Sequence, residues 1–213
     1  MTDGRADLVG LLREEVEALL RELSEPRYRG RQVFQWVQAR RALDTDAMTS
    51  LPRALRAILA GRVRISRLEA VRVQRAQDGT RKYLFRLSDG EEIESVLIPD
   101  DGRLTACMST QVGCPLACRF CLTGLMGLRR NLRAGEIVGQ ILALQDGLEQ
   151  GERISNIVLM GMGEPLLNFP QVERALRILS DKFGANFSSR RITLSTAGHV
   201  PGIRKLEIGR AHV

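Results

Sequence analysis

In the second half of the chain, short apolar segments alternate with segments of helical spacing, and this alternation constrains the fold more than any other feature. The expected strands and helices, in chain order, are 104–108, 134–148, 156–160, 170–183 and 191–195. Strands that are separated by helices pair in parallel, because the chain must cross back over the sheet before the next strand begins. We therefore predict an α/β fold that contains about three βα units of an incomplete (βα) barrel.

The first part of the chain has apolar side chains at helical spacing and is rich in arginine. The spacing predicts helices over 7–24, 33–37 and 51–63, and Pro26 is expected to end the first of them. The formal charge of the chain is +7, and arginine binds phosphate through paired hydrogen bonds. We therefore expect residues 1–64 to form a small helical domain that binds nucleic acid. A solvated basic surface without that function is the alternative.

Between these two parts, the pattern changes to an alternation of period two. Two Asp-Gly dipeptides, at 78–79 and 89–90, favour tight hairpin turns and predict three antiparallel strands in residues 65–99. Glu94 lies in the last strand, where the neighbours on both faces are apolar, so we expect a buried carboxylate. The residues leave two roles open for it: the partner of a buried arginine, or an acid–base group with an altered pKa.

All four cysteines lie close together in the sequence, which indicates a metal or redox site rather than structural disulfides. Cys114, Cys118 and Cys121 form a CxxxCxxC triplet that one loop can wrap around a single cluster. Three thiolates on a cluster of four irons leave one iron free to bind a substrate. Zinc is the alternative, with Cys107 as the fourth ligand, but structural zinc sites usually combine two separated cysteine pairs.

A CxxxCxxC triplet after the first strand of a βα series resembles the radical S-adenosylmethionine (SAM) superfamily. Residues 107–114 read CMSTQVGC, 130–132 read RNL and 135–140 read GEIVGQ, and these segments resemble the RlmN/Cfr family of RNA adenine methyltransferases. The likeness runs from about Leu8 to Leu206. It implies a [4Fe-4S] cluster on the cysteine triplet, whose open iron is chelated by SAM. Reductive cleavage of SAM then yields a 5′-deoxyadenosyl radical.

The resemblance also implies roles for residues outside the triplet. Gly163 and Glu164 match the turn that holds the amino group of SAM, and Ser195 matches a further SAM contact. Without the resemblance, this turn would be an ordinary βα turn whose glycines let the backbone approach a ligand, and Ser195 a strand-end hydroxyl. Glu94 matches the proposed proton acceptor. Cys107 matches the cysteine that forms a transient disulfide with a second, methylated cysteine near the C-terminus of the family.

The implied function is the transfer of a methyl group from SAM to C2 of adenine in 23S ribosomal RNA, with transfer RNA as a second substrate. A Cfr-type enzyme that methylates C8 is the close alternative, and residues 135–140 favour C2. A non-enzymatic zinc-binding RNA-binding module is the alternative of another class. No stretch approaches the roughly 20 apolar residues of a membrane helix, and no secretory signal is evident. We expect a cytoplasmic monomer that takes electrons from a donor such as flavodoxin.

The last residues, 207–213, do not continue the alternation of strands and helices. Their codons can be written as a widely used sequencing adapter, so we expect a non-native tail on a gene fragment that ends near Leu206. The radical SAM core, residues 100–206, would then be incomplete, and the methylated cysteine would lie beyond it. We therefore expect that this fragment by itself does not methylate RNA.

Overall fold

The computed structural model describes residues 4–206, so the expected non-native tail at 207–213 lies outside the described residues. The helices are α1 (Arg13–Glu22), α2 (Arg27–Gln38), α3 (Arg53–Arg62), α4 (Leu122–Leu125), α5 (Ala134–Asp146), α6 (Phe169–Ser180) and α7 (Val200–Lys205). The strands are β1 (Ala6–Asp7), β2 (Val63–Arg64), β3 (Glu69–Arg75), β4 (Arg81–Arg86), β5 (Glu92–Asp100), β6 (Arg103–Cys107), β7 (Gln111–Gly113), β8 (Leu128–Asn131), β9 (Asn156–Leu159) and β10 (Ile192–Leu194). Short 3-10 helices are η1 (Leu8–Gly10), η2 (Pro165–Asn168) and η3 (Ser189–Arg191).

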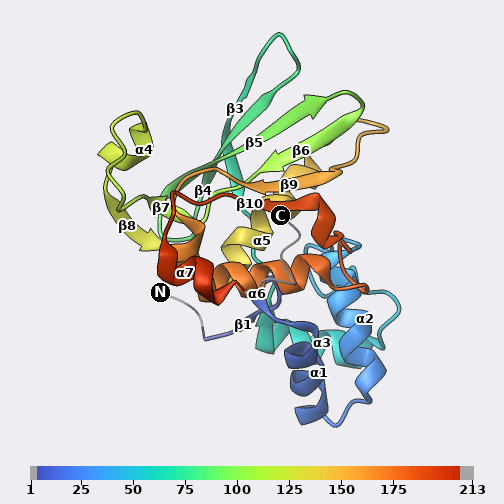
Figure 1. Cartoon of the computed structure of the whole chain (residues 1–213). Helices are drawn as coiled ribbons and strands as arrows, with labels where there is room; N and C mark the ends of the chain where they lie inside the picture. The colour runs from blue at the N-terminus through green and yellow to red at the C-terminus, as the bar shows by residue number, and fades with distance from the viewer. Residues whose placement is uncertain (1–3, 207–213) are drawn as a thin grey trace.

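One six-stranded sheet, in the order β10-β9-β6-β5-β4-β3, organises the molecule (Figure 1). Strands β6, β9 and β10 are parallel to one another, whereas β3, β4, β5 and β6 pair antiparallel in sequence order. The parallel half confirms the α/β class and the expected alternation of strands and helices. The antiparallel half continues directly into it, because β5 pairs with β6 through Val96 and Cys107. The expected boundary after residue 99 is therefore not a break in the sheet.

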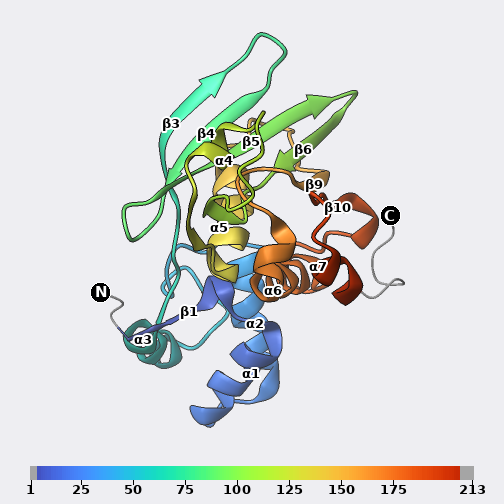
Figure 2. The same ribbon diagram turned by 60° about the vertical axis from the view of Figure 1, so that its left-hand side comes forward.

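Helices α5 and α6 cover one face of this sheet and separate it from α1, α2 and α3 (Figure 2). Helix α5 is apolar on nearly all sides, and Ile137, Ile141 and Leu144 are fully buried. A helix that is apolar all round belongs in the interior, and α5 lies between the sheet, α6 and η1. None of the described helices is long and apolar enough to cross a membrane.

The start of the chain differs from the single helix that we expected over 7–24. Asp7 accepts a hydrogen bond from the backbone N–H of Val9 at 3.2 Å and begins η1 instead. Gly10 then packs on Gly135 at the start of α5, where a Cβ on Gly10 would lie 3.0 Å from the Gly135 nitrogen. A continuous helix would not allow this approach, so α1 begins only at Arg13. Pro26 is the N-cap of α2 rather than the end of α1.

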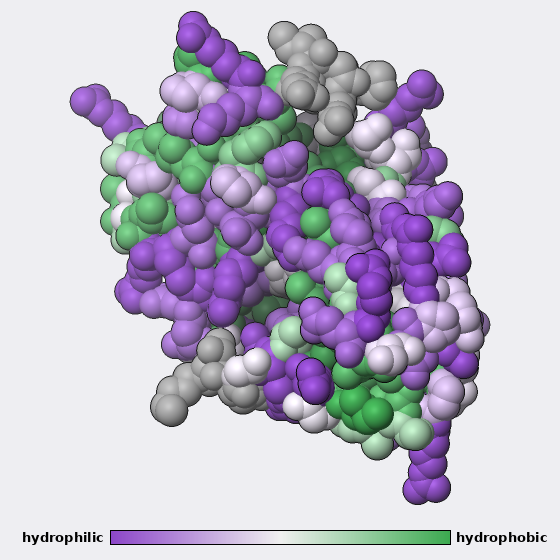
Figure 3. Space-filling view, turned by 90° about the horizontal axis from the view of Figure 1, so that it is seen from below, coloured by the Kyte–Doolittle hydropathy of each residue, from purple (hydrophilic) through white to green (hydrophobic). Residues whose placement is uncertain are grey.

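Ion pairs attach the helical part to α6. Arg174 pairs with Glu15, and Arg177 pairs with Glu14. Arg13 donates to Asp181, just beyond the end of α6, over 2.9 Å. The surface seen from the helical end of the molecule is largely hydrophilic (Figure 3). These charged contacts add to the apolar core that the helical part shares with the α/β part, and the exterior at this end is polar.

Candidate functional site

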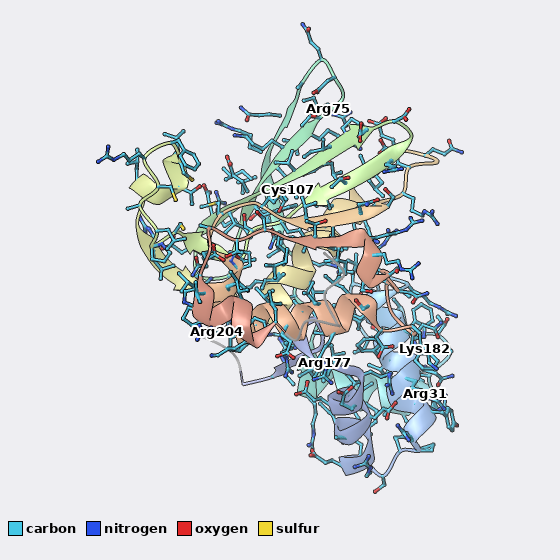
Figure 4. All side chains as sticks on the ribbon, in the orientation of Figure 1. Arg31, Arg75, Cys107, Arg177, Lys182 and Arg204 are labelled. Carbon is cyan, nitrogen blue, oxygen red and sulfur yellow. The ribbon has the colours of Figure 1, made fainter. Side chains whose placement is uncertain are left out.

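The face of the sheet opposite α5 and α6 carries several of the predicted site residues. Cys107 on β6 is paired with Val96 on β5, and paired residues point to the same face. Glu94 lies two residues before Val96 and shares this face, which we call the uncovered face. Cys107 is also paired with Val158 and lies in the middle of the sheet (Figure 4). Ser195 follows β10, and by the alternation of the strand its side chain lies on the same face as that of Cys107. It is exposed.

Glu94 does not have the burial that we expected. Its side chain is 45% exposed, and Oε1 lies 2.9 Å from the ammonium of Lys82 on β4. The expectation failed because both faces of β5 carry apolar residues, yet only the face of Ile93 and Leu97 is packed under helices. Glu94 is therefore neither buried nor paired with an arginine. Its role as proton acceptor stays a prediction.

Cys107 is a largely buried thiol on the uncovered face. Burial raises the pKa of this thiol, against a smaller lowering by the backbone N–H of Met160. The thiol is therefore protonated at neutral pH. All four cysteines are free thiols in the described part of the chain, so no disulfide is formed among them.

The cysteine triplet lies on a loop that is closed at its base by the β7–β8 hairpin, which the sequence did not predict. Cys114 follows β7 directly, and its backbone N–H donates to the Gly127 carbonyl at 3.1 Å. Gly113 has φ +75°, and a Cβ there would lie 1.8 Å from the Gly127 oxygen, so only glycine fits. Cys121 is the N-cap of the short helix α4.

The thiols of this loop fit an iron–sulfur cluster in type and number. The backbone N–H groups of Gly124 and Thr123 lower the pKa of the Cys121 thiol and favour its thiolate. Cys114 is buried, and Cys118 and Cys121 are partly exposed. Within residues 4–206, no three His, Cys, Asp or Glu side chains are gathered in the way that a metal ion requires. The loop therefore presents three soft ligands that would have to turn toward one another to bind a cluster.

The two ends of the loop are attached to the rest of the protein by buried and charged hydrogen bonds. Arg130 on β8 donates to Asp89 at 2.7 Å and to both oxygens of Glu136 at 2.8 and 2.9 Å. These contacts raise the pKa of Arg130 and outweigh the effect of burial on Glu136, whose pKa is lowered. Asn131 accepts from Gln111 at 2.7 Å across the hairpin. The residues that carried part of the family resemblance thus fix the base of the cysteine loop.

The glycine turn after β9 packs closely against β6 and β7 on the side that a Cβ would occupy. A Cβ on Gly161 would lie 2.7 Å from the Met108 carbonyl, and one on Gly163 would lie 2.6 Å from Cβ of Gln111. The glycines therefore let this turn approach β6 and β7 closely. This packing leaves the other side of the turn open to question, so the role of Gly163 in binding SAM stays a prediction.

Glu164 is buried, with a side chain that links the ends of two parallel strands. Its Oε1 accepts from the backbone N–H of Leu166 at 3.0 Å, and its Oε2 accepts from that of Ala197 at 2.7 Å. Ala197 lies in the segment after β10, near Ser195. Each carboxylate oxygen can accept a further hydrogen bond, so the predicted contact with an ammonium group remains open to it.

Sequence reasoning missed two buried amides that hold this end of the sheet together. Gln140 on α5 accepts from the Ser95 hydroxyl at 2.7 Å and from the Ser109 N–H at 2.8 Å, and it donates to the Ser109 carbonyl. Asn168 donates to the carbonyls of Thr110 and Leu132, each at 2.8 Å. A polar residue within an apolar helix is the signal that could have identified Gln140, because buried amides need partners.

Two family models match the chain. The Ribosomal RNA large subunit methyltransferase N-terminal domain matches residues 6–65, and the Radical SAM superfamily matches residues 108–209. Together they coincide with the helical part and with the α/β part that begins at the cysteine loop.

Curated relatives and a solved structure agree with these models. The Dual-specificity RNA methyltransferase RlmN of Rhodospirillum rubrum is 51% identical over 93% of this chain and 48% of the relative. The protein of that name from Syntrophotalea carbinolica is 52% identical over 96% of this chain and 54% of the relative. A crystal structure of a radical SAM methyltransferase from Sphaerobacter thermophilus matches with a TM-score of 0.89 and 47% identity, over 98% of this chain and 62% of that one. The chain spans about half the length of the curated relatives that it matches, and it belongs to the RlmN family of radical SAM methyltransferases.

Proposed function

We propose that the protein to which this chain belongs methylates C2 of adenine in 23S ribosomal RNA and in transfer RNA. One observation carries the proposal: the cysteine loop, the Glu164 turn and the Ser195 segment all follow the carboxyl ends of the parallel strands β6, β9 and β10. Barrel-type α/β enzymes have their active sites at this end of the strands. The relatives named as dual-specificity RNA methyltransferases support RNA as the substrate.

The cofactors of the proposal are a [4Fe-4S] cluster and SAM. Cys114, Cys118 and Cys121 would hold the cluster, and Gly163, Glu164 and Ser195 would hold SAM, as the family resemblance implies. Bound together, the two groups supply one-electron chemistry that generates a carbon radical. The electrons would come from a donor such as flavodoxin, and we propose that the protein acts as a cytoplasmic monomer.

Two side chains of the uncovered face have proposed roles in the reaction itself. Glu94 would accept the proton that leaves the adenine ring, and its ion pair with Lys82 lies on this same face. Cys107 would supply a thiol for release of the product. Its raised pKa keeps that thiol protonated at neutral pH and therefore weakly nucleophilic.

A cluster of cations at the helical end supports binding to the RNA backbone. Arg13, Arg31 and Lys182 all lie over the ring of Phe183, at 5.6, 5.6 and 5.3 Å from its centroid. Arg13 pairs with Asp181, whereas neither Arg31 nor Lys182 forms an ion pair with any described residue. Figure 4 shows Arg31 on α2 and Lys182 near it, beyond the end of α6. Unpaired cations held by an aromatic ring are suited to phosphate contacts.

Reconstitution of the cluster tests the cofactor part of the proposal. After anaerobic incubation with iron and sulfide, we expect about four irons per chain and a brown colour. Replacing Cys114, Cys118 and Cys121 together with alanine should abolish both, and the matched control Cys107→Ala should keep them. Loss of the metal in Cys107→Ala, or purification with zinc in place of iron, would instead indicate a metal site with four cysteines.

Turnover in the intact protein tests the chemical part. Glu94→Gln should retain the cluster and lower the methylation rate by about 100-fold or more, the usual contribution of a general base. The control is Glu92→Gln, which removes a carboxylate from the same strand where it pairs with Arg86. Digestion of the RNA to nucleosides distinguishes 2-methyladenosine from the C8 product. Equal rates for the two variants would remove Glu94 from the mechanism.

A further inference from the structure

The side chain of Gln111 joins the base of the cysteine loop to the glycine turn after β9. Gln111 begins β7, the strand that leads directly into Cys114, and its side chain is fully buried. Its Oε1 accepts from the backbone N–H of Glu164 at 2.8 Å, and its Nε2 donates to Oδ1 of Asn131 on β8 at 2.7 Å. Both ends of the amide therefore have partners, one in the turn and one in the hairpin.

The backbone of the turn also packs on Gln111. The Met162 carbonyl accepts from the backbone N–H of Gln111 at 3.1 Å. Gly163 has φ +100°, and a Cβ there would lie 2.6 Å from Cβ of Gln111. Because glycine is conformationally permissive, it allows the next peptide group more than one orientation. The hydrogen bond from the Glu164 N–H to Gln111 selects one of these orientations and thereby fixes where the Glu164 backbone lies.

The hairpin end of this connection is itself held in place. Strands β7 and β8 form a two-stranded sheet of their own, so the ladder of the six-stranded sheet does not extend to the cysteine loop (Figure 1). Asn131 is paired with Gln111 at the end of the hairpin farther from the loop. The neighbouring Arg130 donates to both oxygens of Glu136 on α5. Gln111 thus connects a fixed hairpin, which carries the cysteine loop, to the turn at the end of β9.

We propose that Gln111 is a positioning residue that sets the cysteine loop and the glycine turn at the separation at which both bind SAM. The inference rests on the proposed cofactors, since the loop would carry the cluster and Glu164 would contact the amino group of SAM. A ligand held by two elements binds more tightly when those elements are already in place, because less freedom is lost on binding. Gln111 acts through the backbone of Glu164 and through Asn131, without touching SAM itself.

Amide exchange in the cluster-free chain tests the structural part of the inference. Gln111→Met keeps the length of the side chain but can neither accept from Glu164 nor donate to Asn131. Exchange of the Glu164 N–H, followed by NMR, should become about tenfold faster or more. The matched control is Gln38→Met, which removes a buried glutamine that donates to the Val9 carbonyl at 3.0 Å. It should leave this exchange rate unchanged, and an unchanged rate in Gln111→Met would overturn the inference.

Binding of SAM to the intact protein with its reconstituted cluster tests the functional part. The readout is the electron paramagnetic resonance spectrum of the reduced cluster, which SAM should change when it binds. Gln111→Met should carry the same iron content and show the same spectrum without SAM, but it should need about tenfold more SAM for the change. Gln38→Met should titrate like the unaltered protein. If Gln111 only stabilised the fold, both variants would lower the melting temperature and neither would shift the titration.

Asn131→Ala guards against a change of fold in Gln111→Met, because Asn131 is exposed and the substitution removes only the hairpin end of the connection. It should weaken SAM binding by less than Gln111→Met does. The double variant should bind SAM no more weakly than Gln111→Met alone, since the two residues form one connection. Additive losses, or equal SAM binding in all variants, would overturn the inference.

These measurements require no RNA, so they separate the inference from the proposed methylation. An intact protein whose SAM binding depends on Gln111 but which methylates no adenine would refute the proposed methylation alone. An intact protein that methylates adenine and binds SAM equally well with Gln111→Met would refute this inference alone.

Discussion

The two faces of the six-stranded sheet are built from the same strands but behave differently. On the covered face, Phe85, Ile93 and Leu97 are fully buried. On the uncovered face, Glu94 and Cys107 lie where no helix of the described chain packs. Because side chains alternate along a strand, β5 supplies a core residue and a proposed acid–base residue at consecutive positions. We therefore expect substitutions on the covered face to change stability and substitutions on the uncovered face to change turnover.

The largest expected difference between the faces is in the free energy of unfolding. Phe85→Ala removes a large buried ring and should cost about 3–5 kcal/mol. The neighbouring Leu84→Ala removes a partly buried side chain from the uncovered face and should cost about 1 kcal/mol. Urea denaturation of the two variants measures both values. Similar losses would show that the uncovered face is also packed, and would remove the basis of the comparison.

A buried polar contact on the covered face should have the next largest effect. Gln140→Leu leaves the Ser95 hydroxyl and the Ser109 N–H without their acceptor and should lower the free energy of unfolding by about 2 kcal/mol. Gln145→Leu is the matched control, because it changes the same residue type on the same helix outside this network. If Gln145→Leu lowers the free energy of unfolding as much as Gln140→Leu does, the loss comes from helix packing rather than from the hydrogen bonds.

The thiols of Cys107 and Cys121 should differ in the pH dependence of their alkylation. Burial raises the pKa of Cys107, so its thiolate forms only above the ordinary range of cysteine, whereas backbone N–H groups lower the pKa of Cys121. At neutral pH, Cys121 should therefore react severalfold faster with iodoacetamide in the cluster-free chain. Mass spectrometry of the modified peptides gives both alkylation rates. In the unfolded chain, the two rates should be equal. A faster Cys107 would place it in a more exposed setting than the structure shows.

The smallest effect is expected for the stability of Glu94→Gln. The Lys82–Glu94 pair is half exposed on both sides, and such pairs contribute about 0.5 kcal/mol. The melting temperature should hardly change, while turnover in the intact protein falls. A large loss of stability together with normal turnover per folded molecule would make Glu94 a structural residue.

Sequence periodicity predicted most of the sheet and its covering helices. Expected strands at 104–108 and 156–160 correspond to β6 and β9, and the helix expected over 134–148 corresponds to α5. These elements were predictable because buried strands and helices have strong apolar patterns. The Asp-Gly turns were predictable for a similar reason, since Gly79 and Gly90 have positive φ.

The parts that the sequence did not predict depend on contacts between distant segments. Strands β7 and β8 are short and are held by Gln111 and Asn131 across the hairpin, so they have little periodicity of their own. Whether Glu94 is buried depends on which face of the sheet the helices cover, and period-two alternation cannot decide this when both faces are apolar. The space beside Gly161 is taken by Met108, a residue far away in the sequence.

The hairpin that closes the cysteine loop has a consequence for how such a protein matures. In small zinc domains, the free energy of metal binding is the free energy of folding, and removal of the metal unfolds the chain. Here Gly113 and Gly127 meet at the base of the loop through protein contacts alone, and Arg130 fixes that base to α5. These contacts do not involve the cysteine thiols, so we expect the metal-free chain to keep the base of the loop in place, ready for loading with metal.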